Sequence, residues 1–183
     1  MIDKFLLLCV VLLCVVVRPV LASDGQWVLV DSRAQTLTVK QGDKTVLVIE
    51  NVAIGRQGAG RKQHRGDDVT PKGHYQIAWF NDQSPYHRFL GLSYPSRLDA
   101  VNGYKQGIID KKTMRAIIDA HDKGLIPPQN TALGGQIGIH GLGSGSAKVH
   151  RAFNWTHGCI AVTNEEIDRL RALLKKDTPV VVR

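Results

Sequence analysis

The sequence has little of several features that define other protein classes. Only 6% of its 183 residues are aromatic, and no cluster of Lys and Arg is interleaved with them, so nucleic acid is not an expected partner. No segment repeats with a period of 20 to 50 residues, which excludes a solenoid. Charged residues make up 22% and apolar residues 43% of the chain, a balance that excludes a highly charged disordered chain and suits one globular domain.

An apolar run long enough to span a membrane is also absent. The longest run, residues 5–17, has 13 residues, whereas a spanning helix needs about 20. Lys4 precedes this run and small residues follow it up to Ala22, a pattern typical of a secretory signal peptide; a buried core helix is the alternative. We therefore expect residues 1–22 to be a signal peptide and residues 23–183 to be an exported domain of the periplasm or cell envelope. Membrane attachment would require that the signal be retained.

Removal of this signal would change the charge and the cysteine count. It would leave 22 basic and 15 acidic residues, a net charge of +7. A positive field concentrates a protein at an anionic cell envelope, although the charge can equally serve solubility alone. Cys9 and Cys14 would be lost, which leaves Cys159 without an intramolecular disulfide partner. A lone thiol in an oxidising compartment indicates either an inert core residue or chemistry.

Short segments rich in Val, Ile, Leu and Thr alternate with turn residues over much of the chain. They predict strands at residues 27–31, 35–41, 44–54, 74–80, 89–95, 136–140 and 178–183. One helix is predicted between Asp110 and Gly124, and another after a capping box at residues 163–166. Residues 55–73 are polar and rich in glycine, and we expect an ordered loop that walls a cleft. The pattern favours a mostly antiparallel β domain with two peripheral helices.

The residues around Cys159 satisfy the needs of a thiol catalyst, namely a base, a partner that orients the base, and donors for an oxyanion. His140 ends an apolar run before Gly141, so one side of its ring can be held while the other is reached. No carboxylate lies near His140 in sequence, so a main-chain carbonyl is expected to orient it. Gly158 would let a substrate carbonyl approach the backbone amides. On an extended strand, His157 would point to the same side as the sulfur.

Two other interpretations use the same part of the chain. Zinc could be bound by some of the side chains of His140, His150, His157 and Cys159, but their spacing matches no zinc motif and no acidic residue stands nearby as a general base. We therefore expect no metal and no other cofactor. The second interpretation is an envelope-binding domain that has lost its chemistry. The presence of both the cysteine and the histidine favours an enzyme instead.

Three segments carry a resemblance to a known family. His140-Gly141, followed after about fifteen residues by the THGC of residues 156–159, resembles the signature of the L,D-transpeptidase catalytic domain, the YkuD family. Residues 70–75, TPKGHY, resemble the Thr-Pro-x-Gly-x-Tyr segment of that family, and LSYP at residues 92–95, followed by Asp99, resembles another segment. Together the matches span roughly residues 27–183.

The resemblance implies a β-sandwich-like catalytic domain that acts on peptidoglycan stem peptides in cell-wall biogenesis and cell shape. Cys159 would attack the bond between the diamino acid at position three and D-Ala at position four, forming a thioester that an amine resolves into a new cross-link. His140 would be the proton donor and acceptor, oriented by the carbonyl of Gly141. The amides of His157, Gly158 and Cys159 would form the oxyanion hole, with His157 supporting the loop. The resemblance assigns no substrate-binding residue.

One position departs from the family pattern. Many members have Arg two residues after the cysteine, where this chain has Ala161, as in a divergent branch that includes amidases releasing lipoproteins from peptidoglycan. The acceptor therefore stays open between a stem peptide, a lipoprotein lysine, a D-amino acid and water. A cysteine hydrolase of the same fold, with a peptidoglycan-attached lipoprotein as a partner, is the alternative function.

Overall fold

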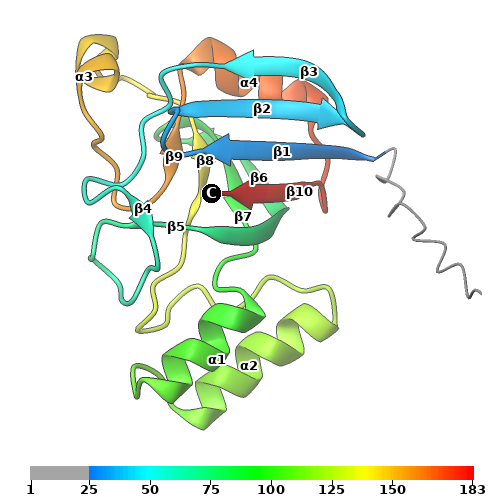
Figure 1. The fold of residues 1–183 in the computed structure, drawn as a ribbon, viewed down its shortest axis with the longest axis vertical. Helices are drawn as coiled ribbons and strands as arrows, with labels where there is room; N and C mark the ends of the chain where they lie inside the picture. Colours follow the sequence, from blue (N-terminus) through cyan, green and yellow to red (C-terminus); the bar gives the residue numbers. More distant parts are fainter. Residues whose placement is uncertain (1–24) are drawn as a thin grey trace, which may run out of the picture.

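The computed structural model describes residues 25–183, so the expected signal peptide lies outside the described residues. A mixed eight-stranded sheet dominates the fold, in the order β3-β2-β1-β10-β6-β7-β8-β9, beside a two-stranded pair of β4 and β5 (Figure 1). The strands are β1 (Gln26–Asp31), β2 (Thr36–Gln41), β3 (Lys44–Ile49), β4 (Ala59–Gly60), β5 (Thr70–Pro71), β6 (Gly73–Ser84), β7 (His87–Leu92), β8 (Gly138–His140), β9 (Ile160–Ala161) and β10 (Pro179–Val182). The helices are α1 (Arg97–Lys105), α2 (Lys111–Asp122), α3 (Ala147–Ala152) and α4 (Asn164–Leu173).

The predicted mostly-β fold is confirmed, but the sheet is not purely antiparallel. β10, the last strand, enters between β1 and β6 and runs parallel to β1, and β8 runs parallel to β9. Parallel neighbours need a crossover connection, and the chain between β8 and β9 supplies one that contains α3. This crossover brings the residues after β8 and the residues before β9 to the same part of the sheet.

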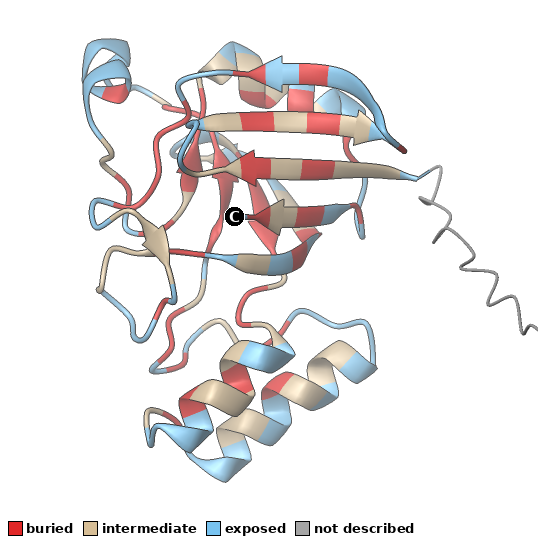
Figure 2. Ribbon diagram, in the orientation of Figure 1, coloured by how far each residue is buried: buried red, intermediate tan, exposed pale blue. Residues whose placement is uncertain are grey.

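Alternating side chains of the strands build one core. Val28 and Val30 of β1 are fully buried, as are Leu37 and Val39 of β2, so the period of two expected from the sequence is observed (Figure 2). These residues belong to the same buried cluster as Ile77, Leu90, Ile139 and Ile160 from the other half of the sheet. The two halves therefore share one core, which α4 covers with Ile167 and Leu170.

Both predicted helices are present with the caps expected from the sequence. Asp110 caps α2 by accepting a hydrogen bond from the Thr113 amide, and Thr163 and Glu166 form the capping box of α4. The structure adds α1 and α3, which the sequence analysis missed. Only Ala100 and Gly103 are buried on α1, so it lacks a helical apolar stripe, and α3 has only six residues.

The lower part of the molecule in Figure 1 is formed by α1 and α2, which pack around a separate small cluster of Ala100, Ile109, Ile117 and Leu133. No helix within residues 25–183 is long and apolar enough to cross a membrane.

The segment that follows β3 departs from its prediction in a way that matters for the site. The predicted strand of residues 44–54 ends at Ile49, because Asn51 takes a positive φ of 57° that breaks the strand. Ala53 then bridges to Ala161 and Gly55 to Thr156. Residues 53–56 therefore run beside the loop that carries Cys159, and residues 55–73 form the ordered, glycine-bearing segment that was expected.

Candidate active site

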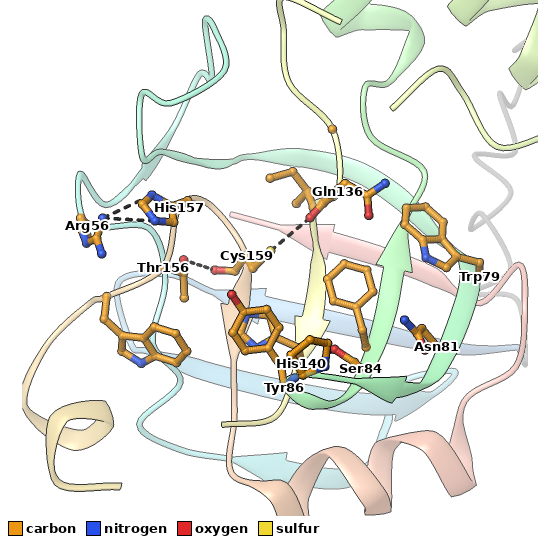
Figure 3. Close-up of a pocket in the computed structure, with 15 residues that line it drawn as sticks. Arg56, Trp79, Asn81, Ser84, Tyr86, Gln136, His140, Thr156, His157 and Cys159 are labelled. Carbon is orange, nitrogen blue, oxygen red and sulfur yellow. Dashed lines mark hydrogen bonds between the residues drawn. The ribbon is translucent and has the colours of Figure 1, made fainter. Parts of the chain in front are cut away.

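His140 and Cys159 line one cleft of about 570 Å³, together with aromatic side chains from the hairpin of β6 and β7 (Figure 3). His140 ends β8, and Cys159 directly precedes β9. These strands are paired neighbours in which His140 lies opposite Ala161 and Ile139 opposite Ile160. The pairing brings together two residues that are nineteen positions apart in the chain.

The imidazole of His140 is enclosed on several sides. It is only 2% exposed, and its ring centroid lies 4.4 Å from Tyr86, 5.7 Å from Trp155 and 6.2 Å from Phe89. Its Nδ1 lies 2.7 Å from the carbonyl oxygen of Gly141. Because that oxygen can only accept, we assign the proton to Nδ1, which leaves Nε2 as the nitrogen that can take a proton. Burial lowers the pKa of His140, partly offset by the Gly141 carbonyl, so the ring is neutral at pH 7.

Asn164, the first residue of α4, fixes the turn that presents the Gly141 carbonyl. Its Oδ1 accepts hydrogen bonds from the amides of Leu142 and Gly143 at 2.8 and 2.9 Å, and its Nδ2 donates to the Gly143 carbonyl at 2.9 Å. A Cβ at Gly141 would lie 2.7 Å from both Asn164 Oδ1 and the Tyr86 carbonyl. Only glycine fits this close approach, so α4 and the β6–β7 hairpin together hold the turn.

The thiol of Cys159 is half-buried and donates to the carbonyl of Gln136 at 3.3 Å. Burial raises the pKa of the Cys159 thiol to about 11, although the backbone of Gly138 and the charge of Lys62 act in the opposite direction. The resting pair is therefore a thiol and a neutral imidazole. Nucleophilic chemistry at Cys159 would require that a thiolate be made, and Nε2 of His140 is the available acceptor of the proton.

The backbone of Cys159 is held by two threonines. Its carbonyl accepts hydrogen bonds from the hydroxyl of Thr156 at 2.7 Å and of Thr70 at 3.4 Å. Thr70 also accepts from the Gly55 amide at 2.8 Å, so the segment that resembles Thr-Pro-x-Gly-x-Tyr is tied to the loop of the cysteine. Tyr94 and Asp99, from the other family-like segment, have structural roles here. The hydroxyl of buried Tyr94 donates to the Leu133 carbonyl, and Asp99 completes the capping box of α1.

His157 does not lie on an extended strand, so the condition under which it would point to the side of the sulfur is not met. Residues 157 and 158 form a bend before β9, and the side chain of His157 is 71% exposed. Its Nδ1 lies 2.6 Å from Asp68 Oδ1, at the rim of the cleft beside Arg56 (Figure 3). The imidazole is thus fixed by a neighbouring segment and is engaged away from the sulfur.

Gly158 has a positive φ of 126°, and a Cβ there would lie 2.7 Å from the Val69 carbonyl. Its missing side chain therefore permits packing against residues 55–73, a need that the sequence did not reveal. Its amide donates to the Thr156 hydroxyl at 3.1 Å. The amides of His157 and Cys159 make no hydrogen bond within residues 25–183, so these two donors are available to an oxyanion.

Four residues of the site were missed by the sequence analysis: Arg56, Tyr86, Trp155 and Asn164. Trp155 directly precedes the THGC motif and is one of three tryptophans in the chain, a signal that could have been used. Arg56 and Tyr86 reach the cleft through sheet and bridge pairings that leave no local pattern. Within the described residues, no group of three or more His, Cys, Asp or Glu side chains is arranged to hold a metal ion.

Known proteins resemble this chain in family and in fold. The model of the YkuD family, the L,D-transpeptidase catalytic domain, matches residues 25–182. Among solved structures, the helical cell shape determining protein Pgp2 from Campylobacter jejuni is 20% identical with a TM-score of 0.60, and the match covers 90% of this chain and 52% of Pgp2. Bd1075 from Bdellovibrio bacteriovorus is 21% identical with a TM-score of 0.55, covering 88% and 49% of the two chains.

An L,D-transpeptidase from Enterococcus faecium is 13% identical with a TM-score of 0.50, covering 87% of this chain and 50% of that one. At these identities the likeness shows the fold. The chain spans about half the length of these solved structures. No curated protein sequence matches the chain.

Proposed function

The chain belongs to the L,D-transpeptidase catalytic domain family, whose members act on peptidoglycan stem peptides, and on that premise we propose that it is a cysteine-dependent L,D-transpeptidase. Residues 23–183 are the exported catalytic domain in this proposal, and residues 1–22 are its signal peptide. One observation carries it: Cys159 shares a cleft with His140, whose Nδ1 is bonded to the Gly141 carbonyl so that Nε2 is left to accept a proton.

In the proposed mechanism, Nε2 of His140 takes the proton of Cys159, and the thiolate attacks the carbonyl carbon of the diamino acid at position three. The amides of His157 and Cys159 donate to the oxyanion, joined by Gly158 when its amide leaves the Thr156 hydroxyl. The imidazolium then gives its proton to the nitrogen of the departing D-Ala, which leaves a thioester on Cys159.

An acceptor amine completes the cycle. It loses a proton to His140 as it attacks the thioester, the carbon–sulfur bond breaks, and the sulfur regains a proton from the imidazolium. The products are a new amide bond and the free thiol. The carbonyl of Gly141 stabilises the imidazolium that forms in each half-reaction, because it accepts the Nδ1 proton in both charge states.

A hydrolase is the second candidate, since water can resolve the same thioester. Ala161 favours it: this residue is fully buried in β9 at the position where many family members have arginine. The bond attacked would then be a stem-peptide bond or the link to an attached lipoprotein.

The test is mass spectrometry of sacculi and purified muropeptides after incubation with the mature protein, with Cys159→Ala as the control. Cross-links between two position-three residues support the transpeptidase. Tripeptides without cross-links, or released lipoprotein, support the hydrolase. If the wild type and Cys159→Ala give the same products, both candidates are rejected.

A further inference from the structure

Arg56 is the one residue with a fixed charge that lines the cleft within the described part of the chain. The lining contains no Asp, Glu or Lys, and its other titratable groups are His140, His157, Tyr86 and Cys159. Arg56 is therefore the group of this lining that can attract a negative group of a substrate, and Asp68, which lies outside the lining, offsets part of its charge.

The backbone places Arg56 beside the cysteine loop. Its amide donates to the Thr156 carbonyl at 3.0 Å, next to the bridge between Gly55 and Thr156. A Cβ at Gly55 would lie 2.2 Å from the Asp68 carbonyl, so this close contact depends on glycine. The main chain of Arg56 is therefore fixed beside the loop that carries Cys159, and its side chain lies next to His157 at the rim of the cleft (Figure 3).

Among residues 25–183, only the Nη1 nitrogen of the guanidinium has partners. Nη1 lies 3.4 Å from Asp68 Oδ2, and 3.3 and 3.4 Å from the two ring nitrogens of His157. Nε and Nη2 make no hydrogen bond within residues 25–183, and the side chain is 50% exposed. These two nitrogens form the edge of a guanidinium that binds a carboxylate with two parallel hydrogen bonds.

Asp68 pairs with Arg56 only through Nη1, and it pairs with His157 as well. Its Oδ1 lies 2.6 Å from His157 Nδ1, whereas the distance from Oδ2 to Arg56 is 3.4 Å. Asp68 thus holds both the imidazole of His157 and the Nη1 end of the guanidinium. The arrangement orients Arg56 and leaves its outer edge open.

We propose that Arg56 binds a carboxylate of the substrate through Nε and Nη2, and that it selects stem peptides with a free carboxylate near the attacked bond. This inference rests on the proposed function and assigns its substrate-binding residue. Two carboxylates have the required chemistry: the terminal carboxylate of the departing D-Ala, and a side-chain carboxylate of the diamino acid at position three.

The experiment compares three tetrapeptides: the free acid, its C-terminal amide, and the peptide amidated at the side chain of position three. The ratio of kcat/KM between acid and amide is measured for the wild type, Arg56→Gln and Arg56→Lys. Arg151→Gln, which removes an exposed cation of α3 that does not line the cleft, is the matched control.

In the wild type and in Arg151→Gln, we expect one of the two amidations to lower kcat/KM about tenfold or more, as for loss of a charge-assisted hydrogen bond. The amidation that lowers kcat/KM identifies the carboxylate that Arg56 binds. In Arg56→Gln the ratio falls to about one, and Arg56→Lys lies between. Equal ratios in the wild type and Arg56→Gln, or a wild type indifferent to both amidations, overturn the inference.

Binding to a Cys159→Ala background separates this inference from the proposed function. The Kd of each peptide is measured by NMR titration with and without Arg56→Gln, and circular dichroism checks each fold. Cys159-dependent turnover without an effect of Arg56 on acid-to-amide ratios overturns the inference and leaves the proposed function standing. If binding of the acid depends on Arg56 but the wild type shows no turnover, the inference stands and the proposed function is overturned. If the wild type shows neither turnover nor Arg56-dependent binding, the inference and the proposed function are both overturned.

Discussion

At the scale of single residues, burial acts on Cys159 and His140 in a way that keeps both uncharged. It raises the pKa of the thiol to about 11 and lowers the pKa of the imidazole, since each charged form would lose its hydration. The thiol proton is directed to the Gln136 carbonyl in the resting state. The thiol of Cys159 is thus protected from oxidation in the free protein, because the thiolate is the reactive species.

The first prediction concerns the rate of iodoacetamide labelling of Cys159. In the wild type the rate should keep rising from pH 7 towards pH 11, because the thiol titrates near 11. His140→Ala should slow labelling at pH 7 to 8 by about tenfold or more, since the nearby base is lost. His157→Ala should leave this rate unchanged, because its ring is bonded to Asp68.

The measurement is the pH profile of labelling by intact-protein mass, with melting temperatures for both variants. The roles are reversed if His157→Ala slows labelling with an unchanged melting temperature while His140→Ala does not.

A second prediction at this scale is acylation by a carbapenem. A strained β-lactam carbonyl can occupy the cleft beside Cys159 and the free amides of His157 and Cys159, and the ring-opened product stays attached to the sulfur. The mass of the intact protein should rise by one drug mass, and Cys159→Ala should show no adduct. An unmodified wild type at millimolar drug would contradict an acylation-competent site.

At the scale of elements, α4 is predicted to position the base. Asn164 makes three hydrogen bonds to the turn of residues 142–143, and this turn presents the Gly141 carbonyl to His140. Asn164→Ala should destabilise the fold by roughly 1–3 kcal/mol, because two amides and a carbonyl lose their partner. It should also lower kcat more than it raises KM, since the imidazole loses its fixed orientation.

Asn164→Asp is the informative partner variant, because it keeps the acceptor for both amides and loses only the donor to Gly143. We expect it to retain most of the stability, measured by urea denaturation, and part of kcat. If Asn164→Ala lowers stability but leaves kcat and the pH profile unchanged, Asn164 only supports the helix.

The elements predicted from sequence are those with a local signal. The strands with a period of two and the helices after Asp110 and Thr163 were found because burial and capping leave a pattern within a few residues. α1 was missed because its buried positions are Ala100 and Gly103. The end of β3 was misplaced because the left-handed conformation of Asn51 interrupts an apolar run.

The residues of the site also fall into those with a local sequence signal and those without one. Cys159, His140 and Gly141 were named from a motif, and the structure brings them to one cleft, while their catalytic roles stay predictions. Arg56 could not be found from sequence, because it reaches the cleft through isolated bridges between segments about one hundred residues apart. The bend at residues 157–158 could not be predicted, because alternation does not distinguish a bend from a strand of two residues, and the role of His157 in supporting the loop stays a prediction.

At the scale of the whole molecule, three carboxylates form ion pairs that connect elements distant in the sequence. Asp82 and Asp168 connect the β6–β7 hairpin to α4 through Arg88 and Arg171, and Asp31 pairs with Arg183 near the end of the chain. Hydrogen bonds lower the pKa of each of these carboxyls. For Asp82 the donors are Arg171 and Arg88. For Asp168 they are first His87 and then Arg88, and for Asp31 first the Ala34 amide and then Arg183. The hairpin that carries Tyr86 to the face of His140 therefore depends on ionised carboxylates.

The last prediction is the loss of stability in acid in two stages. The pKa values of His140 and His150 are lowered by burial, so between pH 7 and pH 5 the unfolded chain binds protons near 6.5 that the folded chain does not. The melting temperature should therefore fall over this range.

Below pH 4 the melting temperature should fall more steeply, because Asp31, Asp67, Asp82 and Asp168 have lowered pKa values and lose their partners when protonated. Asp99, whose pKa is raised by burial, has the opposite effect above pH 4, because the folded chain takes up this proton at a higher pH than the unfolded chain. Calorimetry from pH 3 to pH 8 measures both stages, and His150→Gln should flatten the first and leave the second. A melting temperature that stays constant from pH 7.5 to pH 5 would contradict the buried neutral state of the histidines, and with it the resting state assigned to His140.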